Sequence, residues 1–368
     1  MSELTKGALA LTTDWRYLAM FLIAGILIYL AIAKEYEPML LLPMGFGALM
    51  ANIPFSAAIG PEGPLTVLFE MGIKTELFPL LIFVAVGAMI DFGPLLKNPK
   101  MLLFGGAAQF GIFFTLSLAT LMGFSLKEAA AIGIIGAADG PTSIYVAGIF
   151  APQLLAPISV AAYSYMSLVP IIQPPVIRAL TTLEERRIRM PYHDAAVSKR
   201  VKMVFPVLVT LLAGIIAPVS VPLIGFLMFG NLIRESGVTE RLSKSAQNEL
   251  ANLVTILLGV TIGSTMTADS FLNLATFKII GMGLIAFVFD TAGGVLFAKA
   301  MNLFSKTKIN PMVGAAGISA FPMSARVIQR EAQKADPGNF ILMHAVSANV
   351  GGQIGSIIAG GLILALIR

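Results

Sequence analysis

The stretch Ile132-Gly-Ile-Ile-Gly-Ala-Ala-Asp139-Gly-Pro-Thr-Ser-Ile-Tyr145 decides how the chain folds. It is apolar except for Asp139, and a carboxylate at membrane depth costs several kcal/mol unless it is paired, protonated or coordinating a cation. Gly140 and Pro141 interrupt a helix at this point and free backbone carbonyl groups, while Thr142 and Ser143 add hydroxyls. The stretch therefore predicts a broken membrane helix that carries a cation site. In the alternative interpretation, Asp139 only caps the half-helix that begins at Pro141.

Composition places this stretch in a polytopic membrane protein. The 368 residues are 57% hydrophobic and 12% charged, which is more apolar surface than one soluble core can bury. The apolar residues come in long runs, which favours helices over a closed barrel. We predict an all-α membrane protein with apolar segments at residues 17–33, 38–53, 77–90, 101–123, 129–150, 154–177, 204–217, 219–233, 250–266, 277–297, 309–325 and 340–367.

Charge and cysteine content exclude several classes of site. The chain has no Cys and two His, so thiolate sites, disulfides and a His-only zinc site are excluded. We expect no cleaved signal peptide, and we predict that the region 181–202, rich in Lys and Arg, is a cytoplasmic loop. Because apolar segments flank this loop on both sides, we do not interpret it as a nucleic-acid site.

The two halves of the chain resemble each other. Gly136-Ala-Ala138 parallels Gly314-Ala-Ala316, the region 43–52 parallels 222–231, and Gly87 parallels Gly263, all at nearly one offset. We predict a first membrane repeat at 1–180 and a second at 203–368, each with a discontinuous helix, and we expect these helices to meet near the bilayer midplane. The short segments 38–53 and 219–233 favour inverted over parallel repeats.

The second interrupted stretch lies at residues 310–326 and has the same pattern without the acid. Asn310 and Ser319 offer neutral oxygens, Gly314 permits close backbone approach, and Arg326 supplies a positive charge or lies at the interface. If the two breaks meet, Asp139 and Ser319 share one sodium site. Oxygen ligands of this kind suit sodium, and we regard Asn310 and Asn349 as further candidates for that site.

Three more polar residues interrupt apolar segments, and each has two interpretations. Tyr165 is either a proton-passing phenol or a packed aromatic side chain. Asn349 either completes the cation site or holds neighbouring helices together. Asp290 is either a second ionisable site or a group held without function.

On the motif Gly136-Ala-Ala-Asp139-Gly-Pro-Thr142 and on residues 310–326, 229–238 and 252–266, the chain resembles the β subunits of the sodium-translocating, biotin-dependent decarboxylases. The resemblance implies release of carbon dioxide from carboxybiotin with uptake of a proton and export of sodium. It implies catalytic roles for Asp139, Tyr165 and Arg326, with carboxybiotin at Arg326, and sodium ligands at Asp139, Asn310, Gly314 and Ser319. Asn349 is a sodium-site candidate only from its place in an interrupted apolar segment. The cofactors implied are the sodium ion and biotin.

The resemblance also implies partners: a carboxyltransferase α subunit, a separate biotin carrier protein, a small membrane γ/δ subunit and further copies of this chain, in a bacterial inner membrane. This chain has no Ala-Met-Lys-Met motif, so the biotin is carried elsewhere. Its length and Ser347-Ala-Asn349 favour a CoA-thioester substrate, methylmalonyl-CoA or glutaconyl-CoA, over oxaloacetate. The competing hypothesis is a stand-alone sodium/proton secondary transporter without biotin chemistry.

Overall fold

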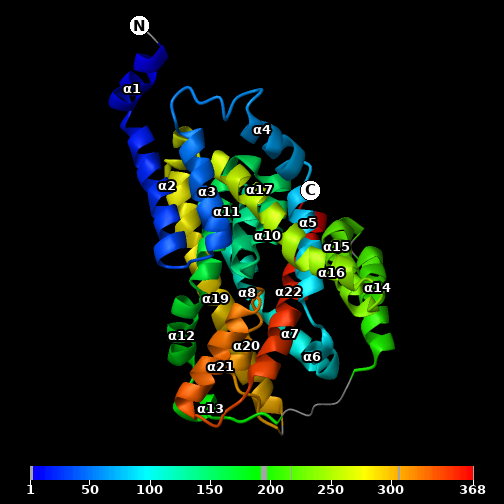
Figure 1. The fold of residues 1–368 in the computed structure, drawn as a ribbon. Helices are drawn as coiled ribbons and strands as arrows, with labels where there is room; N and C mark the ends of the chain where they lie inside the picture. Colours follow the sequence, from blue (N-terminus) through cyan, green and yellow to red (C-terminus); the bar gives the residue numbers. More distant parts are fainter. Residues whose placement is uncertain (1–2, 192–196, 217, 306, 368) are drawn as a thin grey trace.

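The computed structural model describes residues 3–191, 197–216, 218–305 and 307–367, and every regular element in these ranges is helical (Figure 1). This confirms the predicted all-α membrane class. A helix satisfies its backbone hydrogen bonds internally, which apolar surroundings require. His193 and the centre of the basic loop lie outside the described residues.

Fewer helices cross the molecule in one piece than the apolar segments suggest. Among the described residues, four helical stretches are long and apolar enough to span a membrane: Trp15–Ala33, Pro99–Leu121, Leu274–Phe304 and Leu342–Leu366. Two bent pairs raise the number to six if each counts as one span, with a bend of 61° between Pro64–Ile73 and Leu77–Met89 and of 68° between Pro152–Ser167 and Val169–Leu180. The prediction that some segments are broken is confirmed.

The helices form two groups. The first group, which we call the outer bundle, exposes much apolar surface and consists of α2 (Trp15–Ala33), α3 (Pro38–Ala51), α5 (Leu77–Met89), α14 (Lys199–Ile216), α15 (Val221–Ser236) and α17 (Ala251–Ser264). Short elements join or flank these helices: α1 (Glu3–Thr13), α4 (Pro64–Leu68), η1 (Phe69–Ile73), η5 (Pro218–Ser220), α16 (Glu240–Ser245), η6 (Ala246–Leu250) and α18 (Ala268–Phe271).

The second group, the core bundle, packs around α19 (Leu274–Phe304) and the largely buried α22 (Leu342–Leu366). Its other helices are α7 (Leu102–Ala108), α8 (Phe110–Leu121), α9 (Leu126–Gly133), α10 (Gly140–Phe150), α11 (Leu155–Ser167), α12 (Val169–Leu180), α20 (Met312–Ala315) and α21 (Met323–Ala335). Shorter elements complete it: α6 (Gly93–Lys97), η2 (Pro99–Met101), η3 (Ile134–Ala137), η4 (Pro152–Leu154) and α13 (Leu183–Arg186).

The outer bundle has an internal correspondence that follows the predicted duplication. Helix α3 packs on α17, and α15 packs on α5, so each contact joins one half of the chain to the other (Figure 1). Asn52, at the end of α3, donates from its amide to the carbonyl of Met266 at 2.6 Å, and Asn231 in α15 donates in the same way to Ile90 at 2.8 Å. Asn52 thus bonds the segment that follows α17, and Asn231 bonds the segment that follows α5, so each Asn reaches into the other half of the chain. The duplication and the orientation of the repeats both stay predictions.

Glycine permits these helices to approach closely. A Cβ added to Gly87 would lie 1.9 Å from the carbonyl oxygen of Leu227, and one added to Gly263 would lie 2.0 Å from that of Met44. No side chain fits at either position. Glycine therefore allows α5 to pack closely on α15 and α17 to pack closely on α3.

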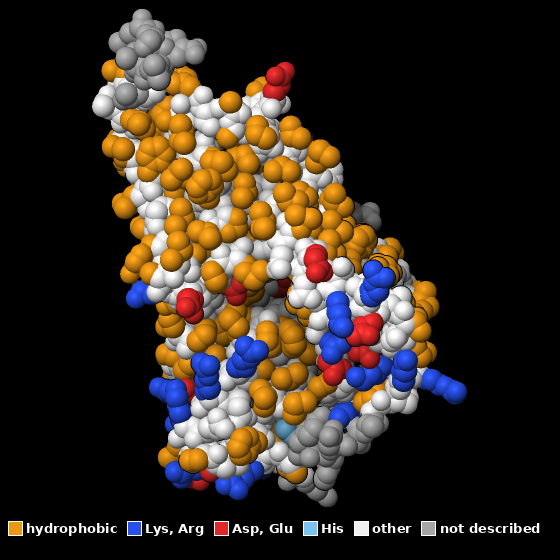
Figure 2. All heavy atoms as spheres, viewed as in Figure 1, with side chains coloured by type: hydrophobic (Ala, Val, Ile, Leu, Met, Phe, Trp, Pro, Cys, Tyr) orange, Lys and Arg blue, Asp and Glu red, His pale blue; other side chains and the backbone are white. Residues whose placement is uncertain are grey.

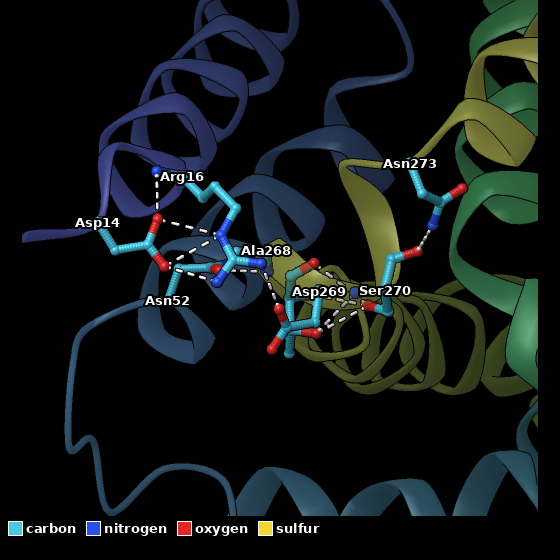
Figure 3. Close-up of polar contacts among 8 residues, drawn as sticks. Asp14, Arg16, Asn52, Ala268, Asp269, Ser270 and Asn273 are labelled. Carbon is cyan, nitrogen blue, oxygen red and sulfur yellow. Dashed lines mark hydrogen bonds and ion pairs between the residues drawn. The ribbon is translucent and has the colours of Figure 1, made fainter.

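Polar contacts hold one end of the outer bundle. Arg16 lies between Asp14 and Asp269 (Figure 3). Its guanidinium nitrogens lie 2.7 Å from a carboxylate oxygen of Asp14 and 2.6 Å from one of Asp269. In the same place the side-chain oxygen of Asn52 accepts a hydrogen bond from the backbone of Ala268 at 2.9 Å. These contacts tie the start of α2 and the end of α3 to the first turn of α18.

Candidate functional site

The first discontinuous helix breaks directly before Asp139. Helix α9 tightens into the 3-10 turn η3, Ala138 adopts a left-handed backbone with φ of 53°, and Asp139 caps the helix α10. Pro141 lies in the first turn of α10, where its missing N–H leaves no bond unmade. The predicted break is confirmed, and so is the capping geometry.

Capping alone does not account for the surroundings of Asp139. Its side chain is 4% exposed and accepts hydrogen bonds from the backbone N–H of Thr142 at 3.2 Å and from the hydroxyl of Ser356 at 2.9 Å. Among the described residues no Lys, Arg or His pairs with it. A buried carboxylate without a countercharge is stabilised by a bound cation or by a proton.

The second discontinuous helix meets the first at Ser319. Helix α20 ends at Ala315, α21 begins at Met323, and Ser319 lies in the irregular segment between them. The backbone N–H of Ser319 donates to the carbonyl of Ala137 at 3.0 Å. The two breaks are therefore in direct contact, as predicted.

One face of α22 covers this meeting point. Asn349, Gln353 and Ser356 are spaced four and three residues apart, so they share a face of the helix. The amide of Asn349 donates to the carbonyl of Ile318 at 2.6 Å, and the amide of Gln353 donates to that of Ser319. The hydroxyl of Ser319 in turn donates to the carbonyl of Gly352 at 2.9 Å.

Two buried oxygens near the breaks have no hydrogen-bond partner of ordinary geometry among the described residues. They are the side-chain oxygen of Asn349 and the hydroxyl oxygen of Thr142, and both residues are 0% exposed. An unmet buried oxygen costs about 1–3 kcal/mol. A cation or a water held by these oxygens removes that cost.

Asp139 and Ser319 line one cavity of about 400 Å³, which we call the Asp139 cavity. One side of its lining comes from the core bundle, including Tyr163 of α11, and the other from the outer bundle, including Glu37 before α3 and Thr255 of α17. In Figure 2 the surface is hollowed at mid-height, with acidic side chains inside the hollow and Lys and Arg side chains below it.

Arg326 lies on α21, outside the lining of the Asp139 cavity. Phe321 and Pro322 line the cavity, and Arg326 follows Pro322 by four residues, about one helical turn. The Arg326 side chain is exposed and makes no ion pair with the described residues. A free guanidinium in this place is available to an anionic ligand that approaches from outside.

The two tyrosines of α11 have different surroundings. Tyr165 does not line the Asp139 cavity. Its hydroxyl instead donates to the carbonyl of Ile280 on α19. Tyr163 lines the cavity, is 5% exposed and packs against Gly140, whose added Cβ would lie 2.2 Å from the Tyr163 ring. Tyr163 is thus the phenol beside Asp139.

Asn310 and Gly314 are not brought to the cavity. The amide of Asn310 donates to the carbonyls of Arg186 and Ile188, both at 2.9 Å, so it ties the basic loop to the second break. Gly314 packs on α19, where its added Cβ would lie 2.0 Å from the carbonyl oxygen of Gly294. Both residues support the framework around the breaks.

Asp290 lies on α19 at 0% exposure, next to the first break. Cβ atoms added to Gly111 and Gly136 would come within 2.4 and 2.6 Å of its two carboxylate oxygens, which have no hydrogen-bond partner that meets ordinary geometry among the described residues. Asp290 thus lies against the start of α8 and against η3, outside the lining of the Asp139 cavity.

Sequence reasoning missed Ser356, Gln353, Tyr163 and Glu37. The first two were visible only as part of a polar, Gly-rich patch in an apolar helix, and their spacing from Asn349 is the signal that marks them as one face. Tyr163 was passed over for Tyr165 two residues on. Glu37 directly precedes the apolar run 38–53, and no signal in the sequence distinguishes it from an interfacial acid.

Comparison with known proteins gives one family. The family model for the Na+-transporting oxaloacetate decarboxylase beta subunit matches residues 16–367. The chain is 53% identical to the glutaconyl-CoA decarboxylase subunit beta of Acidaminococcus fermentans, over 98% of this chain and 96% of that protein. It is 54% identical to the methylmalonyl-CoA decarboxylase subunit beta of Veillonella parvula (98% and 95%) and 47% identical to the oxaloacetate decarboxylase beta chain of Klebsiella pneumoniae (94% and 94%). The broken helices that meet at a buried carboxylate thus occur in a membrane decarboxylase subunit, and the chain belongs to the family of Na+-transporting decarboxylase β subunits.

Proposed function

We propose that this chain releases carbon dioxide from carboxybiotin and couples the release to sodium export by exchanging sodium for a proton at Asp139. The observation that carries the proposal is a carboxylate 4% exposed, without a countercharge, at the contact between two broken helices. Half-helix ends and unwound backbone at such breaks hold ions in transporters.

The proposed sodium ligands are oxygens close to this contact. Asp139 supplies the charge and Ser319 is the neutral oxygen on the second break, and both line the cavity. Asn349 and Thr142 lie outside the cavity lining, and they are further candidates because their buried side-chain oxygens have no hydrogen-bond partner of ordinary geometry among the described residues. Sodium, as a hard cation, favours such a set over nitrogen or sulfur. Asn310 and Gly314 act in this proposal through the framework, because their contacts lie elsewhere.

Exclusive occupancy of Asp139 provides the coupling. One carboxylate neutralised by a proton loses its attraction for sodium, and one that holds sodium loses affinity for the proton. Decarboxylation breaks the bond between the carboxyl carbon and the biotin nitrogen, releases carbon dioxide, and leaves an electron pair on that nitrogen that takes up a proton. A proton taken from the cavity for this step frees Asp139 to bind the next sodium ion.

In this proposal the guanidinium of Arg326 holds the incoming carboxylate group. Its exposure and its lack of an ion-pair partner among the described residues support that role. The biotin belongs to a separate carrier protein, because this chain has no biotinylation motif. Proton delivery by Tyr165 stays a prediction from family resemblance, and the position of Tyr163 in the cavity makes it the stronger candidate.

For the substrate of the complex we favour a CoA thioester, glutaconyl-CoA or methylmalonyl-CoA. Two relatives with those names are 53% and 54% identical to the chain, against 47% for an oxaloacetate decarboxylase beta chain. The proposed setting is a bacterial inner membrane, with a carboxyltransferase α subunit, a biotin carrier, a small γ/δ subunit and further copies of this chain.

The test uses the complex reconstituted in vesicles with carboxylated carrier. Sodium-dependent release of carbon dioxide together with sodium movement supports the proposal. Sodium/proton exchange driven by a gradient, with no requirement for carboxybiotin, would instead support the stand-alone secondary transporter.

A further inference from the structure

A second carboxylate, Glu37, faces the Asp139 cavity from the outer bundle. It lies in the turn between α2 and α3 and lines the same cavity as Asp139, which belongs to the core bundle. Among the described residues the Glu37 carboxylate has neither a hydrogen bond nor an ion pair, and it does not cap α3. Its backbone is left-handed, with φ of 36°, a conformation that costs a non-glycine residue about 1–3 kcal/mol and is concentrated at functional sites.

The chemistry of the cavity favours a cation. Its polar lining consists of Glu37, Asp139, Tyr163, Thr255, Ser319 and Gln353, which all bear oxygen, and none of the described lining residues is Lys, Arg or His. Tyr163 is 95% buried and lines the cavity, and its hydroxyl makes no hydrogen bond with the described residues. Two carboxylates without a cationic side chain give the cavity a negative potential, which concentrates cations and repels anions.

Burial supports the same view of Glu37. Partial desolvation raises the pKa of the Glu37 carboxyl above its ordinary value, so its negative charge is costly unless a positive charge is near. The groups that face it across the cavity are acidic or neutral, Asp139 and Tyr163 among them, so they do not supply that charge. A sodium ion close to Glu37 does, and it also lowers the repulsion from Asp139.

We propose that Glu37 is a second sodium-binding carboxylate, which receives the ion on the outer-bundle side of the cavity and passes it to or from Asp139. This proposal rests on the proposed function, because it assigns a path to the ion that Asp139 exchanges. It assigns the two carboxylates to opposite walls of the cavity.

The test is Glu37→Gln in the reconstituted complex, with carbon dioxide release followed against sodium concentration. We expect the half-saturating sodium concentration to rise about tenfold, equivalent to ~1.4 kcal/mol. Glu37→Asp keeps the charge, so we expect a smaller rise. The matched control is Glu35→Gln, because Glu35 lies two residues earlier in the same turn, is exposed and also has a positive φ. We expect the Glu35→Gln complex to keep the sodium dependence of the wild type.

A second measurement needs no turnover. Binding of radioactive sodium to the purified chain in detergent is expected to weaken in Glu37→Gln and to stay unchanged in Glu35→Gln. A wild-type sodium curve for Glu37→Gln in both assays would overturn the role of Glu37, and so would a shifted pH profile with unchanged sodium affinity. Failure of the wild-type complex to release carbon dioxide in response to sodium would instead defeat the proposed function itself.

Discussion

The hydroxyl of Ser356 donates a 2.9 Å hydrogen bond to Oδ2 of Asp139, although 217 residues separate the two in the chain. The bond connects the last helix, α22, to the first break. The same helix face bonds the second break through Asn349 and Gln353. Helix α22 therefore fixes both breaks relative to each other, and the position of the acid depends on it.

Ser356→Ala removes this bond and leaves Asp139 with the backbone N–H of Thr142 as its remaining partner among the described residues. A hydrogen bond to a charged group contributes about 1.5–3 kcal/mol, so we expect sodium affinity to fall by roughly tenfold or more. Titration of sodium-dependent carbon dioxide release measures the change. Ser347→Ala is the matched control, since Ser347 is also buried in α22 but bonds the carbonyl of Met343 in its own helix. Equal effects of the two substitutions would contradict the assigned role of Ser356.

Tyr163→Phe and Tyr165→Phe separate the two phenols of α11. Tyr163 faces the cavity, so its loss is expected to lower the rate of carbon dioxide release by about 10²-fold, the size of a general acid–base contribution, and to change the pH profile. Tyr165→Phe frees the carbonyl of Ile280 and is expected to cost about 1 kcal/mol of stability with the pH profile kept. If Tyr165→Phe changed the pH profile and Tyr163→Phe did not, the result would support the proton role that family resemblance gives to Tyr165.

Gly87→Ala tests the close packing of α5 on α15. Its new Cβ would lie 1.9 Å from the carbonyl oxygen of Leu227, so the helices must separate, at a cost of about 1–3 kcal/mol. Gly25→Ala in α2 is the control, because no atom lies within 4 Å of its Cβ position and alanine favours a helix by about 0.5–1 kcal/mol. Thermal unfolding in detergent should show a lower Tm for the first and an equal or higher Tm for the second.

Arg178→Ala tests the ion pair that joins α12 to α21. Arg178 contacts Glu331 at 2.8 Å, and the Glu331 side chain is only 3% exposed. Loss of this partner leaves a buried carboxylate with Lys334 alone, at an expected cost of about 1–3 kcal/mol. Arg189→Ala removes a 2.8 Å pair with Asp336, whose side chain is 22% exposed, and should lower Tm less. If Arg178→Ala and Arg189→Ala lowered Tm equally, burial of the acidic partner would not determine what each ion pair contributes to stability.

Local signals in the sequence were enough to predict the two breaks. An acid in an apolar run followed by Gly140 and Pro141 specifies where a membrane helix must end, because the backbone groups freed there need partners. The matching pattern around Ser319 gave the second break. The contact between them followed from the expectation that duplicated broken helices meet.

The contacts of individual polar side chains were not accessible in the same way. Asn310 has the residue type of a cation ligand, yet it bonds the carbonyls of Arg186 and Ile188, because the turn that places it also brings the basic loop within reach. Tyr163 and Tyr165 are two residues apart on one helix and therefore point in different directions, and only the packing of α11 decides which one faces the cavity. Such choices depend on tertiary packing, which local patterns do not encode.

The most direct test of the account is the transport of radioactive sodium by vesicles that contain the Asp139→Asn complex. Asparagine keeps the shape and the capping oxygen but removes the charge, so the fold and the Tm should be retained. We predict that both sodium transport and carbon dioxide release are lost together. Coupled transport at the wild-type rate in a folded Asp139→Asn complex would contradict the exchange of sodium and a proton at this carboxylate.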